Sequence, residues 1–179
     1  DPQALTAVRE IFVDTSALYA LFAARDRNHA TARAALDRMR QSQASLVTSD
    51  VVLLETHVLV HARTGSAGLL RFRSVVGRSR WLRTVEVSPP VAQEAWSLVE
   101  ARVDNGYSFV DATSFVLMRL LGIDEAFSFD DHFRQEGFVM LPGSGIGDHG
   151  RRPKRIRCRR PPIDLKGPRA GAKPHGTVA

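Results

Sequence analysis

The amino-acid sequence predicts an α/β domain built on a mostly parallel central sheet. Short apolar runs of strand length alternate along the chain with longer stretches that have the residue spacing of helices. Two of the apolar runs end directly at an aspartate, Asp14 and Asp130. In open parallel sheets, functional groups gather beyond the carboxyl ends of the strands. We expect one domain over residues 8–143, followed by a tail of different composition over residues 144–179.

The first third of the domain has the pattern strand, helix, helix, strand. Residues 10–13 are apolar enough for a buried strand, and residues 16–24 have helical spacing. Asn28 is a suitable N-cap for a second helix over 28–42, which is rich in Ala, Arg and Leu. A second short strand follows at 45–48.

The rest of the domain continues the alternation. Its first part is expected to form a helix from Ser49 or Asp50 to about His61, a helix over 66–78 after Gly65, and a strand over 81–87. Its second part is expected to form a helix over 88–103 with prolines in its first turn, a helix over 108–122, and strands over 126–129 and 138–141. Ser108 and Asp111 have the spacing of a capping box, and Gly122 suits the position after a helix end.

Charge is distributed unevenly along the chain, whose formal net charge is +6. Residues 1–143 carry 15 Arg, no Lys and 17 acidic residues, a net charge of −2. Residues 144–179 carry 10 basic and 2 acidic residues, a net charge of +8. The tail also holds five Pro and six Gly and almost no large apolar residue, so we expect it to be disordered.

Several classes of protein are excluded or disfavoured. The longest aliphatic runs are four residues, far short of the roughly 20 that a membrane-spanning helix needs. The first ten residues lack the basic-then-apolar pattern of a secretory signal. The single cysteine, Cys158, rules out an internal disulfide and a zinc site made of several cysteines. A cytoplasmic protein without a membrane association is therefore expected.

Four acidic residues lie in apolar surroundings where an unpaired carboxylate is costly. They are Asp14, Glu55, Asp111 and Asp130. No lysine is present in the domain, and none of the four has an obvious arginine partner nearby in the sequence. Carboxylate oxygens without cysteine or histidine suit Mg²⁺ or Mn²⁺, which can activate a water molecule and stabilise charge on a phosphate.

Each of these acids also has a purely structural alternative. Asp14 and Asp111 can cap helices, Asp130 or Asp131 can cap the short turn that follows, and Glu55 can pair with an arginine from elsewhere. Zinc is not expected at His57 and His61, because the H-E-x-x-H order is absent and neither histidine shares a helical face with Glu55.

Taken together, these residues resemble the PIN domain, and within it the VapC-type toxins of bacterial toxin–antitoxin pairs. The resemblance rests on D-T-S-A-L after a strand, a glutamate in an apolar helix, F-V-D-A-T-S-F and S-F-D-x-H-F, in that order. It implies a three-layer α/β/α sandwich whose acids Asp14, Glu55, Asp111 and Asp130 bind Mg²⁺ or Mn²⁺ and catalyse hydrolysis. Ser16 and Ser128 would have supporting roles through their hydroxyl groups.

The resemblance further implies an endoribonuclease that leaves a 5′-phosphate and a 3′-hydroxyl. Its implied partners are an RNA substrate, a cognate antitoxin and a second copy of the chain in a homodimer. The alternative is a PIN-like module that binds RNA or a protein without cutting, although such a module would not need all four acids.

Two basic regions are candidate RNA contacts. Five arginines without an intervening acid could guide phosphates towards the acids or could form a solvated face: Arg71, Arg73, Arg78, Arg80 and Arg83. The tail sequence RRPKRIRCRR could hold RNA electrostatically, or could have no role.

Overall fold

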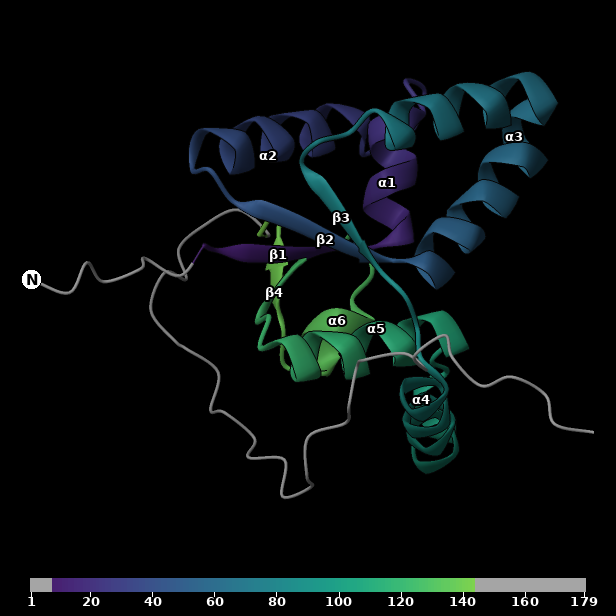
Figure 1. Cartoon of the computed structure of the whole chain (residues 1–179), viewed down its shortest axis with the longest axis vertical. Coiled ribbons are helices and arrows are strands. Elements are labelled where there is room, and N and C mark those ends of the chain that lie inside the picture. Colours follow the sequence, from purple (N-terminus) through teal and green to yellow (C-terminus); the bar gives the residue numbers. More distant parts are fainter. Residues whose placement is uncertain (1–7, 144–179) are drawn as a thin grey trace, which may run out of the picture.

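The computed structural model describes residues 8–143, and a five-stranded parallel sheet lies at its centre (Figure 1). The strands are β1 (Glu10–Val13), β2 (Ser45–Ser49), β3 (Leu82–Val85), β4 (Glu125–Phe127) and β5 (Val139–Leu141). Their order in the sheet is β3-β2-β1-β4-β5, and every pairing is parallel. The predicted α/β class with a parallel sheet is confirmed.

Helices cover both faces of the sheet. They are α1 (Thr15–Phe22), α2 (His29–Gln41), α3 (Asp50–Gly77), α4 (Pro89–Ala101), α5 (Phe109–Leu121) and α6 (His132–Gln135), with a short 3-10 turn, η1, at Val103–Asn105. Figure 1 shows α1 and α2 on one side of the sheet and α4, α5 and α6 on the other. The arrangement is the three-layer α/β/α sandwich that the resemblance implied.

The core forms where strand side chains meet these helices. Ile11, Phe12 and Val13 of β1 are at most 1% exposed, and Phe127 of β4 and Phe115 of α5 are fully buried. Burying each large apolar side chain contributes about 1.5–3 kcal/mol, so the central strands are the most strongly held part of the domain.

The bend in α3 lies at Gly65, where two separate helices were expected. Gly65 has φ +68° and ψ −173°, a backbone conformation that residues with a side chain rarely adopt. Gly68 lies within the second part of the helix, and a Cβ there would come within 1.8 Å of the Thr64 hydroxyl oxygen. Gly65 is therefore not helical itself and separates two helical segments, as expected, and these segments together form the bent element α3.

Several predicted boundaries and environments were wrong in detail. The third strand is only Leu82–Val85, and β4 ends at Phe127, so Asp130 is the third residue after the strand and not the first. Asn28 lies at the start of α2, but its side chain makes no capping hydrogen bond. The apolar helix α3 is not enclosed either, since Leu54 and Val58 are 65% and 64% exposed.

The strand order places a site at the carboxyl edge of β1 and β4. From β1 the chain adds β2 and β3 on one side and later adds β4 and β5 on the other. Ligands of open parallel sheets bind where the strand order reverses in this way. Among residues 8–143, no helix combines the length and apolar character needed to cross a membrane. The predicted disordered tail, residues 144–179, lies outside the described residues.

Candidate metal centre and active site

Asp14 and Ser128 lie side by side because their strands pair in register. Val13 of β1 is opposite Phe127 of β4, and the Asp14 backbone N–H donates to the Phe127 carbonyl at 3.1 Å. Each residue is the first after its strand. Two segments more than 100 positions apart in the sequence thus meet at the reversal point of the sheet.

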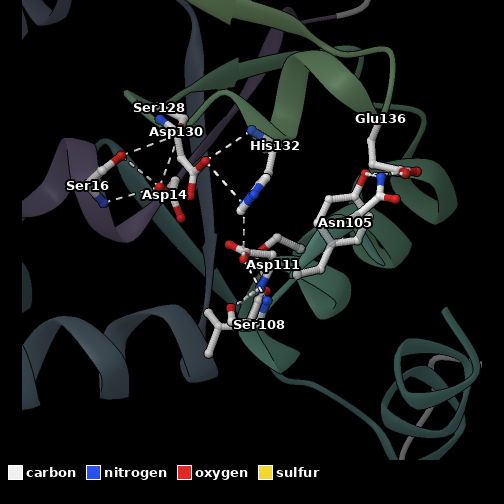
Figure 2. Close-up of polar contacts among 12 residues, drawn as sticks. Asp14, Ser16, Asn105, Ser108, Asp111, Ser128, Asp130, His132 and Glu136 are labelled. Carbon is white, nitrogen blue, oxygen red and sulfur yellow. Dashed lines mark hydrogen bonds and ion pairs between the residues drawn. The ribbon is translucent and has the colours of Figure 1, made fainter. Parts of the chain in front are cut away.

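Asp14 is buried and well supplied with hydrogen-bond donors. Its Oδ2 accepts from the Ser16 backbone N–H at 3.1 Å, from Ser16 Oγ at 2.7 Å and from Ser128 Oγ at 3.1 Å (Figure 2). It is also the N-cap of α1. Burial raises the pKa of the Asp14 carboxyl from 3.8 to about 6, although the hydrogen bonds from Ser16 oppose the shift.

Ser16 and Ser128 connect Asp14 to the loop that carries Asp130. Ser16 Oγ accepts from the Phe129 backbone N–H at 2.9 Å, and Ser128 Oγ accepts from the Asp130 backbone N–H at 3.0 Å. Each hydroxyl therefore donates to the carboxylate and accepts from the loop backbone. This geometry suits the supporting role that the sequence predicted for both serines.

Asp111 and Asp130 come from two different parts of the fold, the first turn of α5 and the loop after β4. Asp111 lies in the first turn of α5, where it forms the predicted capping box with Ser108: the Asp111 N–H donates to Ser108 Oγ at 3.0 Å, and the Ser108 N–H donates to Asp111 Oδ2 at 2.9 Å. Asp130 Oδ1 accepts from the His132 backbone N–H at 3.0 Å. Carboxylate oxygens of both acids and a ring nitrogen of His132 lie within 4.8 Å of one another.

Glu55 reaches the site region from the middle of α3. Its Oε2 accepts from Thr15 Oγ1 at 2.5 Å, and Thr15 directly follows Asp14. Among the ion pairs of the described residues, none joins Glu55 to an arginine, so the alternative of a salt bridge finds no support there. Glu55 is linked to the other acids only through the Thr15 side chain and the neighbouring backbone.

Asp131 behaves differently from its neighbour. Its side chain is 70% exposed and pairs with Arg134 at 2.7 Å, and it makes no capping hydrogen bond to α6. Of the two acids that could cap this turn, Asp130 does so, because it accepts the hydrogen bond from the His132 N–H. Asp130 therefore combines a capping contact with its place beside Asp111.

Two residues of the site, His132 and Thr15, were not predicted from the sequence. His132 Nδ1 lies 3.3 Å from Asp130 Oδ1 and 3.6 Å from Asp111 Oδ2. The motif S-F-D-x-H-F contains this histidine, but nothing in its spacing indicates a contact with Asp111 in another helix. His57, weighed for zinc, hydrogen-bonds through Nδ1 with the Leu53 carbonyl and packs on the Phe72 ring.

The five predicted arginines do not gather at the acids. Arg71 packs over the Phe22 ring at 5.5 Å, and Arg83 pairs with Glu10 at 2.7 Å near the start of β1, the opposite edge of the sheet. Arg73, Arg78 and Arg80 are exposed. Arg71 instead lines a groove of about 750 Å³ between the end of α1 and the bend of α3, together with Arg25, Arg27 and Arg63. The sequence offered no sign that these four would meet.

The donor set fits a divalent cation of the Mg²⁺ or Mn²⁺ type. Carboxylate oxygens dominate, as Mg²⁺ and Mn²⁺ prefer, and the one nitrogen belongs to an imidazole. Nδ1 of His132 is buried and makes no hydrogen bond, as expected of an atom that faces a site for an ion. The fold and the site define a class: α/β domains that use carboxylates at the carboxyl edge of a parallel sheet to bind a catalytic metal ion.

The chain belongs to the PIN domain family. The family's sequence model matches residues 11–138, which include all four predicted acids. PIN domains are metal-dependent nucleases. The family membership that the sequence motifs indicated is thereby confirmed.

Among known proteins, the chain is similar to the 23S rRNA-specific endonuclease VapC20 of Mycobacterium tuberculosis. The two are 39% identical over 135 residues, which cover 72% of this chain and 95% of VapC20. The crystal structure of VapC20, described as a toxin that cleaves the sarcin-ricin loop, superimposes with a TM-score of 0.65 at 37% identity, covering 72% of this chain and 96% of that one.

More distant structures share the fold alone. VapBC2 from Rickettsia felis, bound to a DNA fragment from its promoter, matches with a TM-score of 0.53 at 9% identity and covers 73% of this chain and 96% of that one. FitAcB from Neisseria gonorrhoeae matches with a TM-score of 0.56 at 13% identity and covers 73% of this chain and 95% of that one.

Proposed function

We propose that this protein is a metal-dependent endoribonuclease and the toxin of a toxin–antitoxin pair. The observation that carries the proposal is the convergence of Asp111, Asp130 and His132 within 4.8 Å, beside the buried Asp14. Asp14 is costly to ionise without a cation, as its raised pKa indicates. A catalytic metal ion requires such a cluster of carboxylates, whereas a module that only binds RNA or a protein does not.

The residues of the site are proposed to have different roles. Asp111 and Asp130 would hold the cation, and Asp14 and Glu55 would complete the negative surroundings. A Mg²⁺ or Mn²⁺ ion held there would lower the pKa of a water and neutralise charge on the scissile phosphate. One of the carboxylates would serve as the general base for the attacking water. Ser16 and Ser128 keep the Asp14 carboxylate and the Asp130 loop in fixed relation.

Attack of water at phosphorus leaves a 5′-phosphate and a 3′-hydroxyl. As the PIN resemblance implies, no side chain becomes covalently attached, and Ser16 and Ser128 position Asp14 through their hydroxyl groups. The similarity to VapC20 over nearly its whole length favours ribosomal RNA as the first substrate class to test.

RNA is expected to reach the acids along the basic groove at the end of α1. Arg25, Arg27, Arg63 and Arg71 line it with one acid, Asp26. Helix α1 begins beside Asp14 and has 8 residues, so the groove lies about 12 Å from the acids, within reach of one RNA strand. Arg73, Arg78, Arg80 and Arg83 are weaker candidates for this role.

The proposal includes a cognate antitoxin, a homodimer and a cytoplasmic location. A toxin that cuts cellular RNA needs an inhibitor in the same compartment. The exposed apolar side chains of α3, among them Leu54 and Val58, are consistent with a protein surface that a partner covers. Size-exclusion chromatography with light scattering tests the homodimer directly.

The test is cleavage of ribosomal RNA by the purified full-length protein, with Mg²⁺ or Mn²⁺ and with EDTA. Asp130→Asn is compared with Asp131→Asn, since the two acids are adjacent but only Asp130 faces the cluster. We expect metal-dependent cleavage that Asp130→Asn abolishes and Asp131→Asn retains. Absence of cleavage with any divalent ion and any RNA would favour the alternative, a PIN-like module that binds without cutting.

A further inference from the structure

His132 presents a ring nitrogen to the two carboxylates that are proposed to bind the metal ion. Its Nδ1 lies 3.3 Å from Asp130 Oδ1 and 3.6 Å from Asp111 Oδ2 (Figure 2). The motif S-F-D-x-H-F contains this histidine, but the resemblance implied site roles only for the acids and for Ser16 and Ser128. The inference that follows rests on the proposed metal-dependent function and concerns the ligand set of the same site.

The imidazole ring is held in this orientation from two sides. The His132 backbone N–H donates to Asp130 Oδ1 at 3.0 Å, which fixes the start of α6 against the acid. The ring edge packs on Tyr107, with centroids 5.1 Å apart and planes at 72°. The Tyr107 hydroxyl in turn donates at 2.8 Å to buried Glu136, which pairs with Arg119 and Arg102.

The structural alternative is an ion pair of a protonated His132 ring with Asp111 and Asp130, whereas a neutral ring leaves Nδ1 without a partner. The atom is buried, yet it forms no hydrogen bond, because its contacts with the two carboxylates do not have hydrogen-bond geometry. Buried polar atoms without a partner are rare and call for an explanation such as an ion. Adjacent ligands on an octahedral cation, each about 2.1 Å from the metal, are about 3 Å apart. The observed separations of 3.3 and 3.6 Å are close to that spacing.

We propose that His132 Nδ1 is a direct ligand of the catalytic cation, together with Asp111 and Asp130. The neutral imidazole offers its Nδ1 lone pair, and the fixed ring requires little rearrangement to do so. An imidazole ligand strengthens binding of Mn²⁺ relative to Mg²⁺, which prefers oxygen. The site is therefore selective for Mn²⁺ to a degree that four carboxylates alone would not give.

The experiment is pulsed electron paramagnetic resonance of the full-length protein loaded with Mn²⁺, which detects nitrogen bound directly to the metal. We expect a ¹⁴N coupling of one imidazole in the wild type. His132→Gln should lose it, whereas His61→Gln, which changes an exposed histidine on α3, should keep it. Mn²⁺ affinity should fall at least about tenfold in His132→Gln, since loss of a residue that only hydrogen-bonds to a metal ligand already has an effect of that size. Mg²⁺ affinity should fall less.

The outcomes separate this inference from the function on which it rests. Mn²⁺ that binds the wild type in a manner dependent on Asp111, but without a nitrogen coupling, would overturn the role of His132 and leave the metal-dependent function intact. A wild type that binds no Mn²⁺ at all would overturn both. The wild-type spectrum alone can overturn the role of His132, because absence of a nitrogen coupling excludes an imidazole ligand. Loss of the coupling in His132→Gln, with its retention in His61→Gln, assigns the nitrogen to His132, and the circular dichroism spectrum of His132→Gln checks that the variant is folded.

Discussion

The Ser128 hydroxyl donates a hydrogen bond to the Asp14 carboxylate at 3.1 Å, although the two residues are 114 positions apart in the sequence. The same hydroxyl accepts from the Asp130 backbone N–H at 3.0 Å. One oxygen atom thereby links the end of β1 to the loop after β4. The position of Asp130 relative to Asp14 depends on this link.

Replacing Ser128 by Ala should weaken both the fold and the activity. A hydrogen bond to a charged group contributes about 1.5–3 kcal/mol, and its loss leaves a buried carboxylate with fewer donors. Chemical denaturation measures the loss of unfolding free energy, and RNA cleavage measures the loss of activity. Ser128→Thr keeps a hydroxyl and should restore much of both, whereas Ser97→Ala, at an exposed position on α4, should change neither. Equal stability of Ser128→Ala and the wild type would contradict the linking role.

The metal-free protein should lose stability as the pH rises from about 4 to about 6. The pKa of Asp14 rises from an ordinary value of 3.8 to about 6 in the folded protein. Between these pH values the folded chain holds a proton that the unfolded chain has lost. The unfolding free energy therefore falls with pH, by about 3 kcal/mol in total for this group. Denaturation at several pH values in EDTA measures the slope. Asp14→Asn should remove this contribution; an unchanged slope in that variant would contradict it.

Arg63→Gln combined with Arg71→Gln should weaken RNA binding and reduce its salt dependence. Each lost phosphate contact lowers the slope of log affinity against log salt by about 0.7 on single-stranded RNA. The matched control is Arg38→Gln, an exposed arginine on α2 that does not line the basic groove. If the control and the groove variant show the same slope as the wild type, RNA does not follow this groove.

Removal of residues 144–179 should lower RNA affinity without lowering the melting temperature of the domain. The tail carries a net charge of +8, so it can neutralise phosphates wherever it lies near RNA. The comparison is between the full chain and a chain ending at Gly143, in melting temperature and in the salt slope of RNA binding. A large fall in melting temperature would show that the tail belongs to the folded unit.

The sequence was a good guide wherever structure follows from local pattern. The strand before Asp14, the capping box of Ser108 and Asp111, and the break at Gly65 all depend on residues close in the chain. These features placed Asp14, Glu55 and Asp111 correctly on their elements or directly after them, whereas Asp130 lies two residues further from its strand than expected.

The remaining features depend on packing between distant elements. His132 meets Asp111 only because α6 packs beside the start of α5, and the arginine groove forms only where α3 bends towards the end of α1. Thr15 reaches Glu55 across the two helices that carry them. A contact made by a single hydroxyl or imidazole group leaves no periodic pattern in the sequence, so the sequence alone does not predict it.

We propose that the four acids are held close together to bind a cation, and that this arrangement lowers the stability of the metal-free fold. Carboxylates in one site repel each other when no cation is present, and unfolding relieves that repulsion. Asp111→Asn removes one charge at nearly constant shape and keeps an oxygen that can accept from the Ser108 N–H. Asp37→Asn, at an exposed site on α2, is the matched control for loss of a charge.

The most direct measurement is the melting temperature of the wild type, Asp111→Asn and Asp37→Asn in metal-free buffer and in millimolar Mn²⁺. In metal-free buffer, Asp111→Asn should melt at the same temperature as the wild type or slightly higher. Mn²⁺ should stabilise the wild type and Asp37→Asn by mass action and stabilise Asp111→Asn much less. Strong destabilisation by Asp111→Asn without metal, together with no stabilisation of the wild type by Mn²⁺, would show that the acids are structural and would contradict the account.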